Sequence, residues 1–333
     1  NEVYDRPAAL PTVAAGTLVD DLSRRDFSVN AMALPLWPSG ADELIDPHGG
    51  QEDLAERRLR VLHERSFFDD PTRILRGVRL GARLGLEMEP QTEDLAKNAI
   101  QSGAFVPLSA NRLRRELALL LDAPEVVPSL QELERLGCLE FLGVEDPLEK
   151  RDWEIVGRWG HLRESATDVA RAEAGLRWWL VYLMATTLGA SRRARTRLAR
   201  RLDLDERLGA ILMDGPERVE RVTTVLETPR VRPSMMKRAL DGLTGEELAL
   251  LRATIDSGGR ERVEEWDRSL RDLRLGISGS DLVTAGYTPG PEIGEVLEAT
   301  LDARVDGRIR PDEEMEFALA QLAGENSGIG TES

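Results

Sequence analysis

After residue 71, apolar side chains recur at the three- and four-residue spacing that is typical of amphipathic helices. The first stripe consists of Ile74, Leu75, Val78 and Ala82. A second stripe follows Ser109, a suitable N-cap, and its members are Leu113, Leu117, Leu120 and Leu121. The same periodicity continues at 130–142, 170–188, 219–226, 246–255 and 260–273. The pattern therefore predicts an almost entirely helical chain from residue 71 onward.

Residues 1–45 have a different pattern. Residues 2–4 are strand-like, residues 7–16 form a Pro/Gly-rich loop, and residues 27–36 mix β-branched and small side chains. The next stretch, 42–54, is rich in turn residues, and its two adjacent glycines at 49 and 50 suit a tight or left-handed turn. We therefore expect an α+β protein, in which a β-containing segment precedes a long helical body.

Composition and length narrow the class of protein. A chain of 333 residues with 41% hydrophobic residues suits a soluble globular protein with two or more domains. The most apolar run, 176–190, is too short to span a bilayer of about 30 Å, so we interpret it as a buried helix. No secretory signal is visible, and the single cysteine, Cys138, permits no internal disulfide. Both observations agree with a cytoplasmic location.

The net charge of −16 argues against a generic nucleic-acid-binding protein, because neutralising phosphates requires clustered cations. Basic residues are nevertheless concentrated locally: residues 191–201 hold six arginines and no acid. Such a patch can bind phosphate within an acidic protein. It can equally be the solvated face of a helix, and the sequence leaves both interpretations open.

Asp70 and Arg73 have the chemistry that is needed to select two of the four bases. Cytosine and adenine each present an exocyclic amine beside an unprotonated ring nitrogen, whereas uracil and guanine present a carbonyl beside a ring N–H. A carboxylate only accepts hydrogen bonds and a guanidinium only donates them, so this pair suits C and A and leaves U and G mismatched. On a helix, the two residues would lie one turn apart. Alternatively, Asp70 is simply an N-cap followed by Pro71.

Three blocks, 24–33, 46–54 and 69–76, resemble the bacterial class II tRNA nucleotidyltransferases and their poly(A) polymerase relatives. The resemblance covers residues 1 to about 325. It implies the C-terminal part of a polymerase-β-like nucleotidyltransferase palm, followed by an all-α neck, body and tail. We place the partial palm at 1–50, the base-reading neck at 51–125, and the tRNA-binding helical body and tail at 126–333.

The resemblance also implies roles for individual residues. Arg25 would contact the nucleotide phosphate or ribose, for which its planar fork is suited, and Asp26 and Asn30 would order the site near the sugar. The implied nucleotide-binding residues are Arg25, Asp70, Arg73, Arg76 and Arg79. The implied supporting residues are Arg24, Asp26, Asn30 and Asp69. Arg79 fits less well, since on a helix it lies about half a revolution from Asp70.

The family resemblance implies Mg²⁺ held by two aspartates that precede the arginine-rich block. No Asp-x-Asp pair occurs before Arg24, and the adjacent Asp20 and Asp21 cannot both point to one face of a strand. We therefore expect the metal-binding aspartates to lie upstream of Asn1, with no metal ligands in this chain. As a fragment truncated at its N-terminus, the chain would then be unable to catalyse.

The activity that the resemblance implies is addition of C and/or A from CTP or ATP to the 3′ end of tRNA, without a nucleic-acid template. The expected partners are the tRNA acceptor arm and ATP and/or CTP, with no membrane. Two alternatives stay open: a poly(A) polymerase of the same superfamily, and a non-catalytic remnant that binds RNA or nucleotide. The sequence decides neither the product (CC, A or CCA) nor the oligomeric state.

Overall fold

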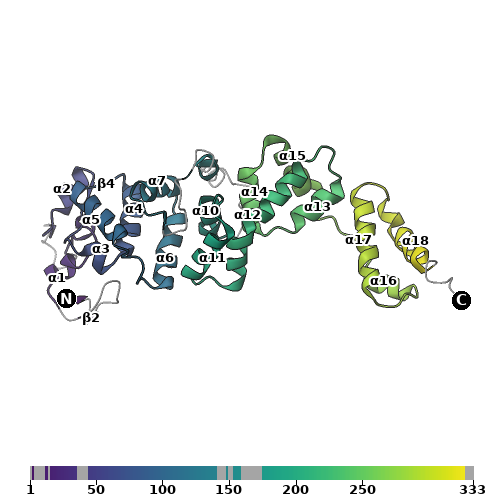
Figure 1. Cartoon of the computed structure of the whole chain (residues 1–333), viewed down its shortest axis with the longest axis horizontal. Coiled ribbons are helices and arrows are strands. Elements are labelled where there is room, and N and C mark those ends of the chain that lie inside the picture. Colours follow the sequence, from purple (N-terminus) through teal and green to yellow (C-terminus); the bar gives the residue numbers. More distant parts are fainter. Residues whose placement is uncertain are drawn as a thin grey trace. The chain divides into compact units, whose positions relative to one another are not determined.

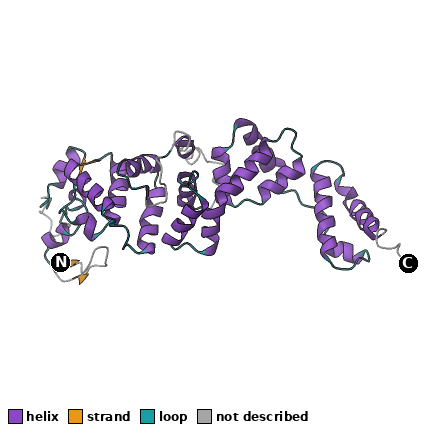
Figure 2. Ribbon diagram, in the orientation of Figure 1, coloured by secondary structure: helices purple, strands orange, loops and turns teal. Residues whose placement is uncertain are grey.

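The computed structural model describes residues 2–3, 12–13, 16–35, 44–140, 148, 153–158 and 175–326. Its contacts divide the chain into two compact units, Asn1–Pro216 and Glu217–Ser333. Helices dominate both units (Figures 1 and 2). The predicted domain boundaries at residues 50 and 125 both lie inside the first unit, whereas the predicted body and tail are shared between the units.

The helices of the first unit are mostly short. They are α1 (Leu18–Ser23), η1 (Ser28–Asn30), α2 (Gly50–Ala55), α3 (Ser66–Asp69), α4 (Thr72–Leu84), α5 (Pro90–Gln101), α6 (Ala110–Leu121), α7 (Val126–Arg135), α10 (Trp178–Thr186) and α11 (Arg192–Arg201). Helix α12 (Glu206–Glu227) crosses the division between the units and contains Pro216. Within the unit, α4 packs against α6 and α7, and α6 packs against α10.

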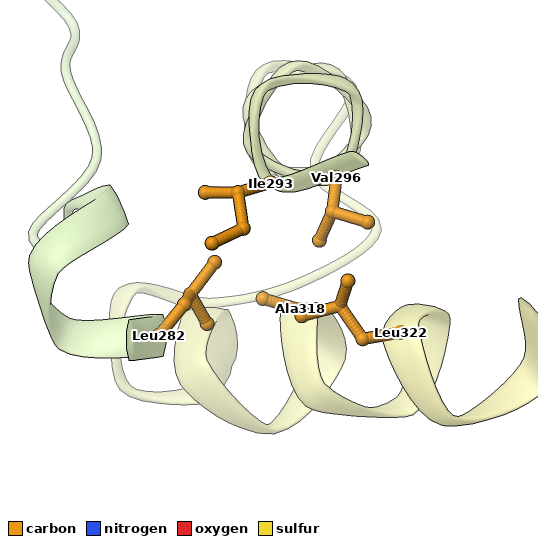
Figure 3. Close-up of a cluster of buried hydrophobic side chains, with 5 residues drawn as sticks. All are labelled: Leu282, Ile293, Val296, Ala318 and Leu322. Carbon is orange, nitrogen blue, oxygen red and sulfur yellow. The ribbon is translucent and has the colours of Figure 1, made fainter. Parts of the chain in front are cut away.

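The described residues of the second unit form helices joined by turns and loops, with no strand among them. The unit contains α13 (Pro233–Asp241), α14 (Gly245–Thr254), α15 (Ser257–Glu265), the π-helical turn η3 (Trp266–Leu270), α16 (Gly279–Thr284), α17 (Pro291–Val305), η4 (Pro311–Glu313) and α18 (Glu314–Asn326). Figure 3 shows a buried cluster in which α16, α17 and α18 meet; it comprises Leu282, Ile293, Val296, Ala318 and Leu322. The C-terminal helices therefore have an apolar core of their own.

The strands are short and pair in twos. The first pair, β1 (Glu2–Val3) and β2 (Thr12–Val13), is antiparallel, and the second, β3 (Arg58–Leu59) and β4 (Glu87–Met88), is parallel. The strand expected at 2–4 is thus present as β1, while Tyr4 and most of the predicted 7–16 loop lie outside the described residues. The fold is α+β with a small β component, as the sequence indicates.

The predicted helical stripes lie in the core. In α4, Ile74, Leu75 and Val78 are buried and Ala82 is half-buried. All four leucines of the second stripe are fully buried in α6. Ser109 does occupy the N-cap position of α6, but its side chain makes no capping hydrogen bond.

The apolar run 176–190 forms α10, in which every residue from 180 to 186 is buried. This arrangement confirms the prediction of a buried helix. Among the described residues, no helix combines the length and the apolar character that crossing a membrane requires.

The turn at Gly49 and Gly50 brings α2 against the segment that holds the first arginine-rich block. Gly49 has a φ of 72°, which favours glycine, and a Cβ on Gly50 would lie 2.4 Å from the carbonyl oxygen of Ser28. The carboxylate of Asp46 caps α2 by accepting from the backbone N–H groups of Gly50 and Gln51 at 2.7 and 2.9 Å. The left-handed turn predicted at these glycines is therefore confirmed at Gly49.

Candidate nucleotide-binding site

Asp26 connects the two arginine-rich blocks. Its carboxylate, 7% exposed, accepts from the Phe27 N–H and from Asn30 Nδ2, each at 3.1 Å, through Oδ1. Its other oxygen, Oδ2, forms an ion pair with Arg76 Nη2 of α4 at 2.8 Å. The structure therefore brings together Asp26, Asn30 and Arg76, three residues that the resemblance assigns to one site.

Arg73 makes a second connection between the blocks. Its guanidinium is buried and donates from Nη1 to Ser66 Oγ at 2.7 Å and from Nη2 to the carbonyl oxygen of Arg24 at 3.1 Å. These contacts use two of the five N–H groups of the guanidinium. They fix the side chain by its flanking segments and leave donors for a further partner.

Asp70 differs in position from what the spacing predicts. Helix α4 begins at Thr72, so Asp70 precedes the helix in extended conformation and does not share its surface with Arg73. Its Oδ1 accepts from the backbone N–H and the hydroxyl of Thr72 at 3.1 and 2.6 Å, as a capping residue does. The same oxygen pairs with Arg112 Nη2 of α6 at 2.8 Å.

The partners of Asp70 are thus separate from those of Arg73 in this structure. Asp70 is bonded to Thr72 and Arg112, and Arg73 to Ser66 and Arg24. The expected geometry of two side chains one turn apart on one helix is wrong for Asp70, since Pro71 and the extended residue before it lie outside α4. Joint contact with one base edge stays a prediction.

Arg24 and Arg25 lie on the exposed end of α1. Arg24 donates from Nε to Asp21 Oδ1 at 2.8 Å, and Arg25 Nη2 pairs with Asp21 Oδ2 at 3.1 Å with its side chain 50% exposed. Hydrogen bonds from Arg24, and then from Arg25, lower the pKa of the Asp21 carboxyl. Neighbouring Asp20 takes part in the capping box of α1, where its carboxylate accepts a hydrogen bond from the Thr17 N–H at 2.8 Å. Both acids of this pair therefore have local structural partners.

The remaining predicted residues have simpler surroundings. Asp69 pairs with Arg65 at 3.3 Å at the end of α3. Arg79, in α4, has a buried Nε that forms no hydrogen bond with any residue described by the structure. A buried donor of this kind is unfavourable without a partner. The structure leaves the nucleotide roles of both residues as predictions.

The surroundings of Arg73 are electropositive. His63 is an exposed residue near this guanidinium, and partial desolvation, followed by the positive charge of Arg73, lowers the pKa of its imidazole. The buried guanidinium favours an anionic or hydrogen-bond-accepting ligand at this place.

Two supporting residues were not singled out from the sequence. Arg112, which holds Asp70, is 42 residues away in the chain, and only the packing of α6 against α4 brings it close. Asp53 is fully buried in α2 and accepts from Ser28 Oγ at 2.5 Å and Arg60 Nε at 2.9 Å. Two arginines at alternate positions, Arg58 in β3 and Arg60 directly after it, both pair with Asp53. Their spacing is the signal that could have indicated such a buried acid.

The described residues do not fit a magnesium site. They contain no group of three His, Cys, Asp or Glu side chains placed to hold a metal ion. Divalent cations such as Mg²⁺ require oxygen ligands that converge on one point. The acids nearest the site, Asp26 and Asp70, instead have arginine partners.

Comparison with known proteins gives consistent matches. The model of the poly A polymerase head domain matches residues 2–60. The A-adding tRNA nucleotidyltransferase of Geobacter sulfurreducens is 33% identical over 327 residues, which are 96% of this chain and 37% of that protein. A CCA-adding enzyme solved in complex with CTP has a TM-score of 0.79 and 28% identity, covering 92% of this chain and 72% of that one. This likeness confirms the predicted fold class.

The chain thus spans little more than a third of the Geobacter relative. A second relative, the CC-adding tRNA nucleotidyltransferase of Deinococcus radiodurans, is closer to this chain in length. It is 30% identical to this chain over 325 residues, which are 98% of this chain and 72% of the relative. Identity at this level over nearly the whole chain, with both arginine-rich blocks joined in the structure, leads to one conclusion. The chain belongs to the tRNA nucleotidyltransferase family.

Proposed function

We propose that this chain acts in the addition of C and/or A to the 3′ end of tRNA, with CTP and ATP as substrates and no nucleic-acid template. The observation that carries the proposal is the pair of contacts between the two blocks, Asp26 with Arg76 and Arg73 with the Arg24 carbonyl. These contacts bring hydrogen-bond donors and acceptors of the two arginine-rich blocks to one place, in a chain that belongs to this family.

Base selection is assigned to Asp70 and Arg73. The contacts of Asp70 with residues that the structure describes involve Oδ1, so its second oxygen can accept from an exocyclic amine without displacing them. Arg73 keeps three N–H groups beyond its two hydrogen bonds, and one of them can donate to an unprotonated ring nitrogen. Uracil and guanine would leave these nearly buried groups mismatched, which is costly.

Phosphate and ribose contacts are assigned to the remaining arginines. Arg25 is half-exposed and its ion pair with Asp21 is a surface pair, which contributes little and can be exchanged for a phosphate. Arg76 is oriented by Asp26 and is 43% exposed, so its guanidinium is accessible to a ligand. The unpartnered Nε of Arg79 provides one more donor.

The proposed activity is expected to use Mg²⁺, and no step through the metal is assigned to the residues of this chain. The acceptor arm of tRNA is the proposed RNA partner, bound by the helical segments after the neck. A cytoplasmic location follows from a tRNA substrate.

Equilibrium binding of CTP, ATP, UTP and GTP to the full chain tests the base-selection proposal. We expect CTP and ATP to bind at least about tenfold more tightly than UTP and GTP, because the mismatched bases leave polar groups unsatisfied. In Asp70→Asn, which can both donate and accept, this ratio should fall to about threefold or less. Asp94→Asn, an exposed aspartate of α5, is the matched control.

The same measurements separate the alternatives. A poly(A) polymerase would bind ATP and reject CTP. A remnant that binds RNA alone would bind none of the four nucleotides. Equal affinity for all four in the wild-type chain would contradict the assignment of Asp70 and Arg73 to base selection. Incubating the chain with labelled CTP or ATP and tRNA transcripts ending before and within CCA then identifies the product, if the chain catalyses.

A further inference from the structure

The six arginines of 191–201 lie on α11, and the structure divides them into two sets. Three of them are used by the protein itself. Arg192 pairs with Asp214 at 2.5 Å, and Arg201 donates to the carbonyl oxygen of Phe105 at 2.6 Å. Arg195, only 2% exposed, donates from Nε to Met213 O at 3.1 Å. This half of the basic cluster therefore stabilises the fold of the first unit.

The other three arginines, Arg193, Arg197 and Arg200, are exposed. They lie at i, i+4 and i+7, which places them within about 60° of one another around the helix and along about 10 Å of its axis. We call this set the arginine face. The guanidinium groups of Arg193 and Arg200 form no hydrogen bond or ion pair with any residue that the structure describes. Arg197 has a partner in the protein, so Arg193 and Arg200 are the two arginines of the face that we consider for a ligand.

The arginine face is a local exception in an acidic chain. The chain carries a net charge of −16, and the face lies in an eleven-residue stretch that contains no acid. Guanidinium groups bind phosphate through two parallel N–H bonds and are less strongly hydrated than ammonium groups. Because the buried arginines of α11 hold the helix against its neighbours, the exposed ones are presented on a fixed support.

We propose that the arginine face of α11 binds the phosphate backbone of RNA. The choice of RNA as the polyanion rests on the proposed function, and tRNA is then the RNA in question. Phosphates follow one another along a nucleic-acid strand at spacings comparable with one turn of this helix, so Arg193 and Arg200 can contact different phosphates. Such contacts position the RNA without reading its sequence.

The test compares two double variants of the full chain that remove the same charge. In Arg193→Gln/Arg200→Gln the face is neutralised, whereas Arg83→Gln/Arg115→Gln removes two exposed arginines of α4 and α6, which lie before the segments to which tRNA binding is assigned. The probe is a tRNA transcript that ends before CCA, and its binding is measured from about 50 to 200 mM salt. We expect the face variant to bind about tenfold or more weakly and its log K against log[salt] slope to fall by about 2.

The control variant should keep the wild-type slope, and thermal melting should show both variants folded. If the face variant binds tRNA with wild-type affinity and slope, the proposal is overturned while tRNA binding itself persists. If the wild-type chain binds no tRNA at all, the proposed function fails first. Salt-dependent self-association that only the face variant loses would instead identify a second copy of this chain as the partner, and would also overturn the proposal.

Discussion

At the scale of single residues, each of the two acids nearest the proposed site is held by an arginine from another segment. Asp26 pairs with Arg76 of α4, and Asp70 pairs with Arg112 of α6, both at 2.8 Å. A carboxylate with such a partner keeps one orientation. Arg112 is therefore a positioning residue for Asp70, although it carries none of the predicted nucleotide contacts.

Replacing Arg112 should loosen base selection more than nucleotide binding as a whole. In Arg112→Gln the Asp70 carboxylate loses its charged partner, so we expect the CTP-to-UTP affinity ratio to fall about three- to tenfold, with a loss of about 1 kcal/mol in the free energy of unfolding. Arg115→Gln, on the exposed side of the same helix, is the control. An unchanged ratio in Arg112→Gln would show that Asp70 needs no partner on α6.

The sequence shows the chemical type of the residues at the proposed site, but it does not show which groups they contact in the fold. The donor and acceptor types of Asp70 and Arg73 are legible from the chain alone. The start of α4 at Thr72 is not legible from the sequence, because the proline directly before it permits a helix start at either residue. The Arg112 contact depends on how two helices pack, and the acceptor for Arg73 is a main-chain oxygen, which no side-chain pattern records.

At the scale of elements, α4 and the segment before η1 are packed closely at Gly77. A Cβ on Gly77 would lie 2.7 Å from Cζ of Phe27, a fully buried ring. The ring also lies beside the antiparallel bridge between Phe27 and Val61, so it has little freedom to move. The absence of a side chain at residue 77 thus sets the distance between the palm segment and the helix that carries Arg73 and Arg76.

Gly77→Ala should destabilise the protein by about 1–3 kcal/mol, because an added methyl group overpacks this contact. Gly209→Ala is the matched helical control: its Cβ would meet only Met213 Cε, at 3.9 Å. This control should be neutral or stabilising by about 0.5–1 kcal/mol. Urea unfolding followed by circular dichroism measures both changes. Equal stability of the two variants would mean that Phe27 shifts at no cost.

Helices α5 and α7 are joined by an ion pair whose strength depends on pH. Glu93 accepts from Arg135 Nη1 at 2.5 Å and from Lys97 Nζ at 2.6 Å. These hydrogen bonds, that from Arg135 foremost, lower the pKa of Glu93 from 4.5 to about 2. The folded state therefore gains stability while the carboxylate is ionised, fully above the unfolded pKa and progressively less as the pH falls from 4.5 toward 2.

Glu93→Gln should accordingly lower the free energy of unfolding by about 1 kcal/mol or less at pH 7, and should not change it at the acid end of this range. The measurement is the free energy of unfolding of wild type and variant at pH 7, 5 and about 3.5. Glu87→Gln, an exposed glutamate of β4, is the control for removing one negative charge. A cost that stays constant with pH would assign the effect to lost packing and not to charge.

At the scale of the whole molecule, the chain consists of two compact units, each with buried apolar side chains of its own. The single cysteine, Cys138, is fully buried in the first unit, and burial raises the pKa of its thiol. Since the thiolate is the reactive form, the native protein should resist labelling. Labelling of this residue therefore reports the opening of the first unit alone.

We expect one labelled thiol in denaturant and essentially none in the native protein at pH 8, as measured with a chromogenic disulfide reagent. With increasing denaturant, labelling and the far-ultraviolet circular dichroism of all helices should give different midpoints, because separate units need not unfold together. Superimposable transitions would mean that the two units unfold as one.

The hydrogen bond from Arg73 to the carbonyl oxygen of Arg24 has a consequence for how this protein can diverge. Every amino acid supplies the same main-chain oxygen at residue 24, so substitutions there leave this hydrogen bond of Arg73 intact. Inserting or deleting a single residue just after it would move that oxygen by several ångströms. Substitutions at residue 24 are thus tolerated during evolution, whereas insertions and deletions in the short stretch that follows it are not.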